Sequence, residues 1–297
     1  MRSLVSVIIP TYNRSFSILY RAVHSVLNQS YKNLELIIVD DNDVNSKYRK
    51  EIEARIKNLV DNRVKYIQHT SNSGACEARN TGIRNAKGEF IAFLDDDDEW
   101  LSNKLELQLQ KFTNKEVGLV YCDSYTIKTK NDSIINKSIR SFRISGMVYK
   151  QLLEKNFVGS TSFVLIRKEA LNECGFFNTE MESAQDYELW LRLSKKYKID
   201  YVDIPLVNYY AHEGERISTN VNKKIQGLEQ IIKLNYLYLQ EHPKILSKRK
   251  SVIVPYYYLR DGYKKAFLKS WDSFKLNPFN THLLKVLVKI TIKEIFK

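Results

Sequence analysis

The sequence predicts an α/β fold, a mostly parallel sheet flanked by helices, with a helical and basic C-terminal extension. Short apolar strands alternate with amphipathic helices through residues 1–112, and these strands are apolar on both faces. Strands of that kind are typical of parallel sheets covered by helices on each side. The last quarter of the chain has a different composition, rich in lysine and tyrosine, and its apolar residues recur at helical spacing.

The first half contains four expected strands and four expected helices in strict alternation. A β-branched run predicts the first strand, which Pro10 ends, and apolar residues three and four apart predict the helix that follows. The expected strands are Val5–Ile9, Leu34–Val39, Val64–Ile67 and Phe90–Leu94, and the expected helices are Ile18–Leu27, Lys47–Leu59, Gly74–Ala86 and Lys104–Phe112.

The second half is mixed, and its elements are predicted from shorter patterns. We expect strands at Val117–Ile127 and Ser160–Ile166, helices at Val148–Lys155 and Glu188–Lys196, a hairpin or mobile loop at Lys128–Ser141, and helices from about Ile217 onward. The predicted organisation therefore has three parts, residues 1–112, 113–216 and 217–297.

Composition is that of a folded protein kept in a reducing compartment. The chain has 297 residues, 43% of them apolar. Cys76, Cys122 and Cys174 are far apart and form no C-x-x-C pair, which excludes a disulfide framework or zinc knuckle and predicts a cytoplasmic protein. Leu4–Pro10 is too short for a signal peptide, and no apolar run reaches the length of a membrane span.

Positive charge is concentrated at the C-terminal end. Residues 221–297 carry 16 Lys and Arg against 5 Asp and Glu, which is most of the net charge of +13. Within them, residues 279–297 predict an amphipathic helix with a broad apolar arc and with Lys285, Lys289, Lys293 and Lys297 on its polar face. Such a helix suits the surface of an anionic bilayer. The alternative is a helix that docks on its own domain with its lysines outward.

A run of acidic residues directly follows the fourth predicted strand. Asp95–Asp98 and Glu99 would repel one another at the end of a packed strand unless a cation lies among them. Mg²⁺ and Mn²⁺ prefer carboxylate oxygens, and when one or two carboxylates hold such an ion its other positions remain for water and substrate phosphates. The alternative is a solvated acidic turn that caps a helix beginning near Trp100.

Polar residues also follow the first and second predicted strands, at Thr11-Tyr12-Asn13 and Asp40-Asp41. Ligands of parallel sheets bind beyond the carboxyl ends of the strands, so these residues and Asp95–Asp98 are expected to share one edge. The chain has neither G-x-G-x-x-G nor G-x-x-x-x-G-K-[ST], which excludes a dinucleotide-binding dehydrogenase and a P-loop enzyme.

A second acidic position lies at the start of a predicted amphipathic helix. Asp186 precedes Leu189, Trp190 and Leu193, which form the inward face of that helix. A carboxylate there either caps the helix or acts as a general base that takes a proton from a hydroxyl.

Five ordered motifs, spread over residues 3–215, resemble the signatures of family 2 glycosyltransferases. They are Val5-Ser-Val-Ile-Ile-Pro-Thr-Tyr-Asn-Arg14, Leu36-Ile-Ile-Val-Asp-Asp41, Ala78-Arg-Asn-Thr-Gly82, Gly88-Glu-Phe-Ile-Ala-Phe-Leu-Asp-Asp-Asp-Asp98 and Gln185-Asp-Tyr-Glu-Leu-Trp-Leu-Arg192. The resemblance implies the GT-A fold, with a Rossmann-like nucleotide-sugar-binding half in residues 1–112 and an acceptor-binding half in residues 113–216.

The resemblance also implies an inverting enzyme that uses Mn²⁺ or Mg²⁺ and a nucleotide-diphosphate sugar, with UDP as the expected nucleotide. The acceptor is expected to be a glycan or a polyprenyl-linked sugar, and binding of the C-terminal helix to a membrane would place that acceptor at the inner face of the cell membrane. Tyr12 would stack on the base, Asp41 would contact the edge of the base, and Asp96 would reach the ribose. Carried over by position, the donor-binding residues are Thr11, Tyr12, Asp41, Arg79, Asp95 and Asp96, the metal ligands are Asp97 and His212, and the catalytic base is Asp186.

Two positions depart from the family pattern. Asn42-Asp43 stands where Gly-Ser is usual, which bears on base preference, and Gln185-Asp186 stands where Glu-Asp is usual. Three other functions compete. A nucleotidyltransferase would carry a glycine-rich phosphate loop that this chain lacks, and a nucleic-acid binder would interleave base-stacking residues with its basic ones. A catalytically weak scaffold with the same fold would not need Asp97 and Asp186.

Overall fold

The structure is a computed structural model that describes residues 3–130, 133–211 and 220–296. The chain divides into two compact units. The first unit consists of Met1–Tyr149, Phe157–Thr179 and Leu189–Glu213, and the second of Lys150–Asn156, Glu180–Glu188 and Gly214–Lys297.

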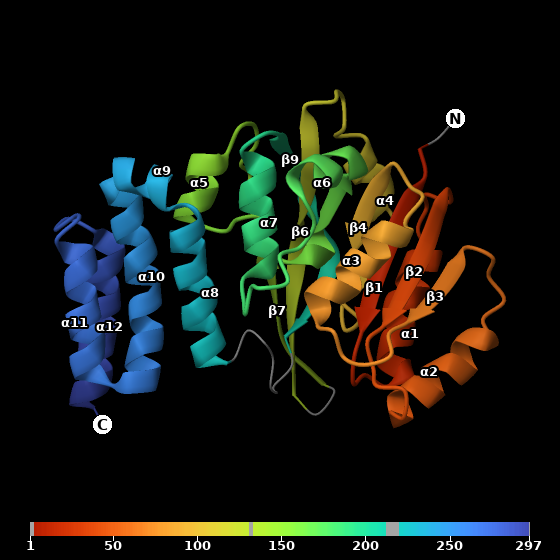
Figure 1. Cartoon of the computed structure of the whole chain (residues 1–297), viewed down its shortest axis with the longest axis horizontal. Coiled ribbons are helices and arrows are strands. Elements are labelled where there is room, and N and C mark those ends of the chain that lie inside the picture. Colours follow the sequence, from red (N-terminus) through yellow and green to blue (C-terminus); the bar gives the residue numbers. More distant parts are fainter. Residues whose placement is uncertain (1–2, 131–132, 212–219, 297) are drawn as a thin grey trace. The chain divides into compact units, whose positions relative to one another are not determined.

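Four parallel strands form one half of the sheet in the first unit, in the order β3-β2-β1-β4 (Figure 1). They are β1 (Val5–Thr11), β2 (Leu34–Asp40), β3 (Val64–Gln68) and β4 (Phe90–Phe93). Residues Thr11 and Asp40 are direct neighbours in the register of β1 and β2. The predicted parallel half, and the shared edge at the carboxyl ends of its strands, are therefore confirmed.

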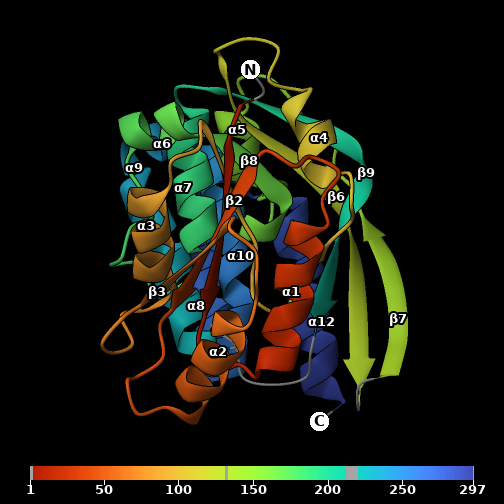
Figure 2. The same cartoon turned by 90° about the vertical axis from the view of Figure 1, so that its right-hand side faces the viewer.

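The other half of the sheet is mixed and continues in the order β8-β6-β9-β5, with β7 paired to β6. Figure 2 shows β7 at the outer side of this half. Strands β8, β7 and β5 run antiparallel to their neighbours, whereas β6 and β9 run parallel to each other. The bounds are β5 (Glu99–Trp100), β6 (Val117–Lys130), β7 (Ser133–Arg140), β8 (Val164–Arg167) and β9 (Lys198–Ala211).

Helices cover both faces of the parallel half. Side chains of α1 (Phe16–Leu27), α2 (Lys47–Lys57) and α4 (Lys104–Leu109) pack in one cluster with alternate residues of β1 and β2. On the other face, α3 (Ala75–Asn85) lies against β1, where a Cβ at Gly82 would come within 2.4 Å of the Ile8 side chain. Glycine at position 82 therefore permits the close approach of α3 to the sheet.

Two further helices complete this part of the chain. The short helix α6 (Lys168–Cys174) follows β8 in the first unit, and α7 (Gln185–Ser194) begins in residues assigned to the second unit and ends in residues assigned to the first. Trp100 and Trp190 are both buried, as expected for core or pocket-wall residues.

The second unit is helical and has its own apolar core. Its core residues come from α8, α10, α11 and α12, including Ile225, Ile253, Leu283 and Ile290. Its helices are α5 (Tyr149–Glu154), α8 (Val221–Leu234), α9 (Tyr236–Glu241), α10 (Pro243–Asp261), α11 (Tyr263–Phe274) and α12 (Thr281–Ile295). These helices confirm the predicted helical C-terminal region.

Three expectations about local structure need correction. No helix begins near Trp100, because Glu99–Trp100 forms strand β5 against β9 and the next helix starts at Lys104. The first part of the expected strand at Ser160–Ile166 is a 3₁₀ turn, Thr161–Phe163, and the strand itself is Val164–Arg167. Strand β9 was not expected at all. The ambiguous segment Lys128–Ser141 contributes to a β6–β7 hairpin.

Candidate active site

The first side of the candidate site is the turn that follows β1. Thr11 ends the strand, and Asn13 has a positive φ of 50° that reverses the chain. Asparagine tolerates this left-handed conformation better than most residues. The backbone N–H of Asn13 donates to Oδ1 of Asn42 at 2.8 Å, which joins the turn after β1 to the loop after β2.

Asp96 and Asp97 lie beside this turn. Oγ1 of Thr11 donates to Oδ2 of Asp96 at 2.8 Å. The Arg14 guanidinium pairs with both aspartates, Nε with Asp96 Oδ1 at 3.0 Å and Nη2 with Asp97 Oδ2 at 3.2 Å. Burial raises the pKa of Asp96 to about 6, although the charge of Arg14 acts in the opposite direction. Arg14 therefore carries much of the charge balance of this cluster.

Asp95 is held from the opposite side by residues of α3 and of the segment before β8. Nη2 of Arg79 lies 2.7 Å from Asp95 Oδ1 in an ion pair. The hydroxyl of Thr161 donates to the same oxygen at 3.1 Å, and that of Ser160 donates to Oδ2 at 3.3 Å. The predicted Arg79 and Asp95 are thus brought together, 16 residues apart in the chain.

Asp98 is fully buried, and its contacts fix the loop that carries Asp95–Asp98. Its carboxylate accepts the hydroxyl of Ser162 at 2.6 Å and the backbone N–H of Tyr210 at 3.1 Å. Burial, together with the charges of Asp95 and Asp97, raises the pKa of Asp98 well above its usual range. Arg21 donates to the carbonyl of Asp97, and its guanidinium lies 3.9 Å from the centre of the Tyr210 ring.

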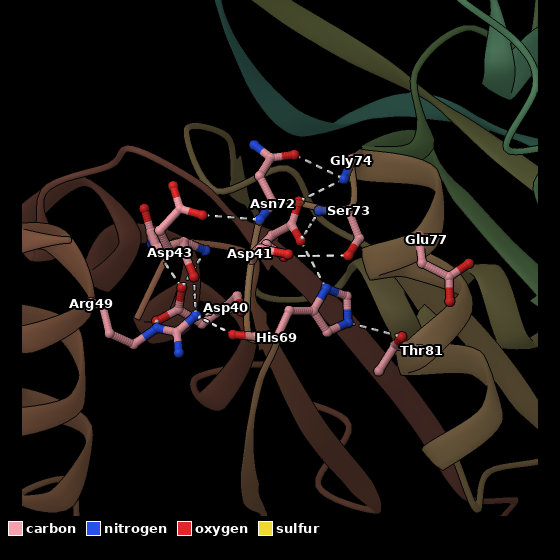
Figure 3. A network of polar contacts seen from close by, with 12 residues as sticks. Asp40, Asp41, Asp43, Arg49, His69, Asn72, Ser73, Gly74, Glu77 and Thr81 are labelled. Carbon is pink, nitrogen blue, oxygen red and sulfur yellow. Dashed lines mark hydrogen bonds and ion pairs between the residues drawn. The ribbon is translucent and has the colours of Figure 1, made fainter. Parts of the chain in front are cut away.

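Asp41 forms a clamp between the end of β2 and the start of α3 (Figure 3). Its carboxylate accepts the backbone N–H of Ser73 at 2.8 Å and that of Gly74 at 2.9 Å, and it pairs with Nδ1 of His69 at 2.7 Å. Nε2 of His69 lies 3.0 Å from Oγ1 of Thr81. A carboxylate at the N-terminal end of a helix is stabilised by the helix dipole. The clamp therefore holds Asp41 firmly at the sheet edge.

Asp40, the neighbour of Asp41, is structural. It is fully buried and pairs with Nε of Arg49 at 3.0 Å, while Asn42 donates to it from both its backbone and its side-chain amide. The hydroxyl of Tyr66 also donates to Asp40, and burial followed by this contact raises the pKa of the Tyr66 phenol. Figure 3 shows Arg49 and Asp40 side by side. Asp40 is thus committed to the loop that carries Asp41 and Asn42.

The donor set fits a divalent cation that is shared with a substrate, and it does not fit a closed metal cage. The described residues include no group of three His, Cys, Asp or Glu side chains arranged to hold a metal. Asp97 offers hard carboxylate oxygens, and its side chain is 19% exposed. One such carboxylate is enough for Mg²⁺ or Mn²⁺ when phosphates and waters complete the shell. His212, the other predicted ligand, lies outside the described residues.

Asp186 is the second residue of α7 and belongs to the second unit, whereas the aspartate cluster belongs to the first. It is half-buried, and its Oδ1 accepts the backbone N–H of Tyr187 at 2.7 Å. Just before it, Ala184 adopts a φ of 58°, which is strained for a residue with a Cβ. Such strain persists only where the surrounding structure enforces it, and strained residues are frequent at functional sites.

The first unit therefore holds the acidic residues through two sets of contacts. Thr11 and Arg14 contact Asp96 and Asp97, and Arg79 contacts Asp95. Tyr12, which follows Thr11 in the chain, is exposed. These contacts also involve residues for which no role was predicted. Arg14 ends the motif Val5–Arg14, which is a signal that could have identified it, but only the fold brings it to Asp96, 82 residues away in the chain. Ser162, Tyr210 and His69 carry no comparable local signal.

Comparison with known sequences assigns the chain to a family. The family described as Glycosyl transferase family 2 matches residues 6–175. The chain is 34% identical over 224 residues to the Escherichia coli UDP-Glc:alpha-D-GlcNAc-diphosphoundecaprenol beta-1,3-glucosyltransferase WfgD, covering 75% of this chain and 83% of that protein. It is 32% identical over 201 residues to the putative teichuronic acid biosynthesis glycosyltransferase TuaG of Bacillus subtilis, covering 66% and 73%.

Solved structures share the fold at lower identity. Staphylococcus aureus TarS (residues 1–349), in complex with UDP-GlcNAc, matches with a TM-score of 0.67 and 17% identity over 91% of this chain and 79% of that one. The mannosyltransferase PcManGT from Pyrobaculum calidifontis, in complex with GDP-Man and Mn²⁺, matches with a TM-score of 0.56 and 18% identity over 99% and 88%. The predicted GT-A fold is confirmed, and this chain belongs to glycosyl transferase family 2.

Proposed function

We propose that this chain is an inverting glycosyltransferase that moves a sugar from a nucleotide-diphosphate sugar, with UDP as its nucleotide, to a hydroxyl of a glycan or lipid-linked acceptor. Residues 1–112 would bind the donor and residues 113–216 the acceptor, with residues 217–297 as a helical basic extension. The observation that carries this proposal is the contact web in which Thr11 and Arg14 hold Asp96 and Asp97 at the ends of adjacent parallel strands.

In the donor site we assign the base to Tyr12 and Asp41. The Tyr12 ring is 41% exposed and therefore has a face on which a base can stack. Asp41 is fixed by two backbone N–H groups and His69, so its position does not depend on the ligand. An ionised carboxylate accepts hydrogen bonds and cannot donate them, so Asp41 would accept from an N–H group of the base, such as the imide N–H of uracil. The choice of UDP itself follows the family resemblance.

We assign the ribose to Asp96, with Thr11, Arg79 and Asp95 as its supporting frame, and the divalent cation to Asp97. When bound, Mn²⁺ or Mg²⁺ would neutralise negative charge on the diphosphate leaving group. His212 would be the second protein ligand. Without a cation, Arg14 pairs with both Asp96 and Asp97. Because a cation on Asp97 would replace Arg14 as its partner, we expect the guanidinium to turn toward the diphosphate when the donor complex forms.

In the transfer step the acceptor hydroxyl attacks the anomeric carbon while the bond from that carbon to the diphosphate oxygen breaks. The electron pair leaves with the nucleotide diphosphate, and Asp186 takes the proton from the attacking hydroxyl. Attack from the side opposite the leaving group inverts the anomeric configuration. A positioned general base of this kind contributes about 10²- to 10⁴-fold in rate.

We further propose an acceptor carried by a polyprenyl diphosphate, and hence a place at the inner face of the cell membrane in cell-surface polysaccharide synthesis. The support is the relative WfgD, whose name specifies a diphosphoundecaprenol-linked GlcNAc acceptor and a UDP-glucose donor.

The first experiment measures thermal stability with UDP, GDP, CDP and ADP, each with Mn²⁺ and each with EDTA. We expect the largest rise in melting temperature with UDP and Mn²⁺, and a smaller rise after chelation. No rise with any nucleotide, from protein shown to be folded, would favour the scaffold alternative. The variant Asp97→Asn should lose the Mn²⁺-dependent part, while Asp203→Asn, at an exposed aspartate of β9, should retain it.

The second experiment measures release of UDP from UDP-glucose in the presence of a lipid-linked GlcNAc diphosphate. We expect Asp186→Asn to lower turnover by about 10²-fold or more while nucleotide binding stays unchanged, because the base acts only in the transfer step. Near-native turnover in Asp186→Asn would contradict the assignment of the base.

A further inference from the structure

Helix α12 is apolar on two opposite sides. Leu283, Val286 and Ile290 are buried in the core of the second unit. A second apolar stripe faces solvent and recurs at intervals of three or four residues, so its members share one face. Its exposed fractions run from 49% to 71% over Leu284, Val288, Ile292 and Ile295. Packing within the unit therefore accounts for only one of the two apolar sides.

Helix α11 carries a matching stripe. Its buried side consists of small residues, Ala266, Ser270 and Ser273. Phe267, Trp271 and Phe274 project from another side and are each between 37% and 51% exposed. The Trp271 and Phe274 rings stack with their centres 5.2 Å apart. Helix α11 thus presents small residues to the core and bulky aromatic residues to solvent.

The two stripes adjoin each other along the seam between α11 and α12. The hydroxyl groups of Tyr263 and Thr291 lie 3.5 Å apart across this seam. Tyr263 also stacks with Phe267, the first residue of the α11 stripe, at 6.2 Å. Thr291 is three residues after Val288 and four before Ile295, so it lies beside the α12 stripe. The stripes therefore form one surface, the α11–α12 apolar face, which runs along both helices.

Lysines border this face on both sides. Lys285 and Lys289 each follow a stripe residue of α12 by one position, which places them about 100° around the helix. On α11, Lys264 and Lys275 are seven residues before and four after Trp271, on the same side as its ring. The exposed lysines at the border are Lys264, Lys275, Lys285, Lys289 and Lys293.

Helices α11 and α12 carry few acidic groups, and these lie away from the α11–α12 apolar face. On α12, Glu294 accepts the hydroxyl of Tyr258, a residue of α10. Asp272 follows Trp271 by one position and so lies about 100° away from the apolar stripe of α11. The α11–α12 apolar face therefore combines exposed aliphatic and aromatic side chains with a cationic border.

We propose that the α11–α12 apolar face binds the interface of an anionic lipid bilayer, with both helices lying in the plane of the membrane. This deepens the proposed function by naming the surface that meets the membrane, and it does not depend on the transfer chemistry. No helix among residues 3–130, 133–211 and 220–296 is long and apolar enough to cross a bilayer. Apolar side chains enter the acyl boundary, while the lysines contact acidic headgroups. The ring of Trp271 lies where the interface favours amphipathic aromatics.

Trp271 provides a site-specific measurement. The chain has three tryptophans, and Trp100 and Trp190 are 3% and 0% exposed, whereas Trp271 is 50% exposed. The full chain is titrated with vesicles of phosphatidylcholine alone or with 30% phosphatidylglycerol, and its emission and its quenching by brominated acyl chains are recorded. We expect a blue shift and quenching with the anionic vesicles only.

Variants separate the two contributions. Lys285→Gln, Lys289→Gln and Lys293→Gln together should weaken partition into anionic vesicles by about a hundredfold, since each lysine near such a surface contributes about one factor of five. Val288→Ser and Ile292→Ser should reduce binding at any salt concentration. Val44→Ser and Val60→Ser are matched controls, because both valines are exposed in the first unit. Trp271→Phe should remove the optical signal while co-sedimentation with vesicles persists.

Two outcomes would overturn the proposal. The first is equal co-sedimentation of the native chain and the triple lysine variant with anionic vesicles. The second is a blue shift of Trp271 that requires no lipid and follows protein concentration, with a dimer in sedimentation equilibrium, which would assign the face to a second copy of the chain. Nucleotide binding in the thermal assay is unaffected by either result, so failure here is distinguishable from failure of the proposed function.

Discussion

Lys104 provides a test of how much a buried charge lowers the stability of the first unit. The side chain is wholly buried in α4, where Nζ donates to Oε1 of Gln108 at 2.7 Å and lies 4.0 Å from the Trp100 ring centre. Burial lowers the pKa of Lys104 from 10.5 to about 8. The perturbation we choose is Lys104→Met, which keeps the length of the side chain and removes its charge.

The magnitude follows from linkage between protonation and folding. Below pH 8 Lys104 is protonated in both the folded and the unfolded chain. Its pKa is 10.5 in the unfolded chain and about 8 in the folded chain, and this difference lowers the free energy of unfolding by about 3 kcal/mol. Between pH 8 and pH 10.5 the unfolded chain binds more protons than the folded chain, so the free energy of unfolding rises with pH. Methionine has no such titration. The advantage of the variant should therefore shrink as pH rises.

Urea unfolding of both proteins at pH 7.5 and pH 10 measures this change. We expect the free energy of unfolding of Lys104→Met, relative to that of the native chain, to fall by about 2 kcal/mol between the two values. Loss of the contact to Gln108 lowers the stability of the variant at both pH values alike, so it does not enter the difference. Lys57→Met, at a side chain 72% exposed, is the control and should show no such trend. A difference between Lys104→Met and the native chain that does not change with pH would show that burial does not lower the pKa of Lys104.

Two other substitutions test local structure around the site. Asp41→Asn should lower the free energy of unfolding by about 3 kcal/mol, because the N–H groups of the α3 N-terminus lose a charged acceptor, whereas the exposed Asp43→Asn should stay within about 0.5 kcal/mol. Equal effects of the two in urea unfolding would disprove the clamp. Gly227→Ala should cost about 1–3 kcal/mol, since the new Cβ would lie 2.5 Å from the carbonyl oxygen of Ser183, three residues before Asp186. Its neighbour Gln226→Ala, on the exposed side of α8, should be neutral or slightly stabilising. A neutral Gly227→Ala in the same assay would show that α8 can move away from Ser183.

Most of the parallel half could be predicted from the sequence because local periodicity alone specifies it. The expected strand at Leu34–Val39 and helix at Ile18–Leu27 differ from the observed β2 and α1 by at most two residues at either end. Strand β9 escaped prediction for a physical reason. It pairs with β6 through several register shifts, so its apolar residues do not alternate regularly and Pro205 interrupts it. Tertiary pairing with β6 and β5 stabilises what local preference does not.

Sequence alone is enough to predict the family, the alternation of strands and helices, and the gathering of Thr11, Asp41 and Asp95–Asp98 at one sheet edge, because parallel strands place their carboxyl ends together. The groups that hold each carboxylate depend instead on tertiary packing. Arg14 and Thr11 meet Asp96 from more than 80 residues away, and Ser162 meets Asp98 from 64. Contacts across such separations leave no mark on local periodicity, since they depend on the packing of whole elements. The same reason explains why the lysine period of α12 indicated an amphipathic helix, while its second apolar stripe became evident only after its first had been buried.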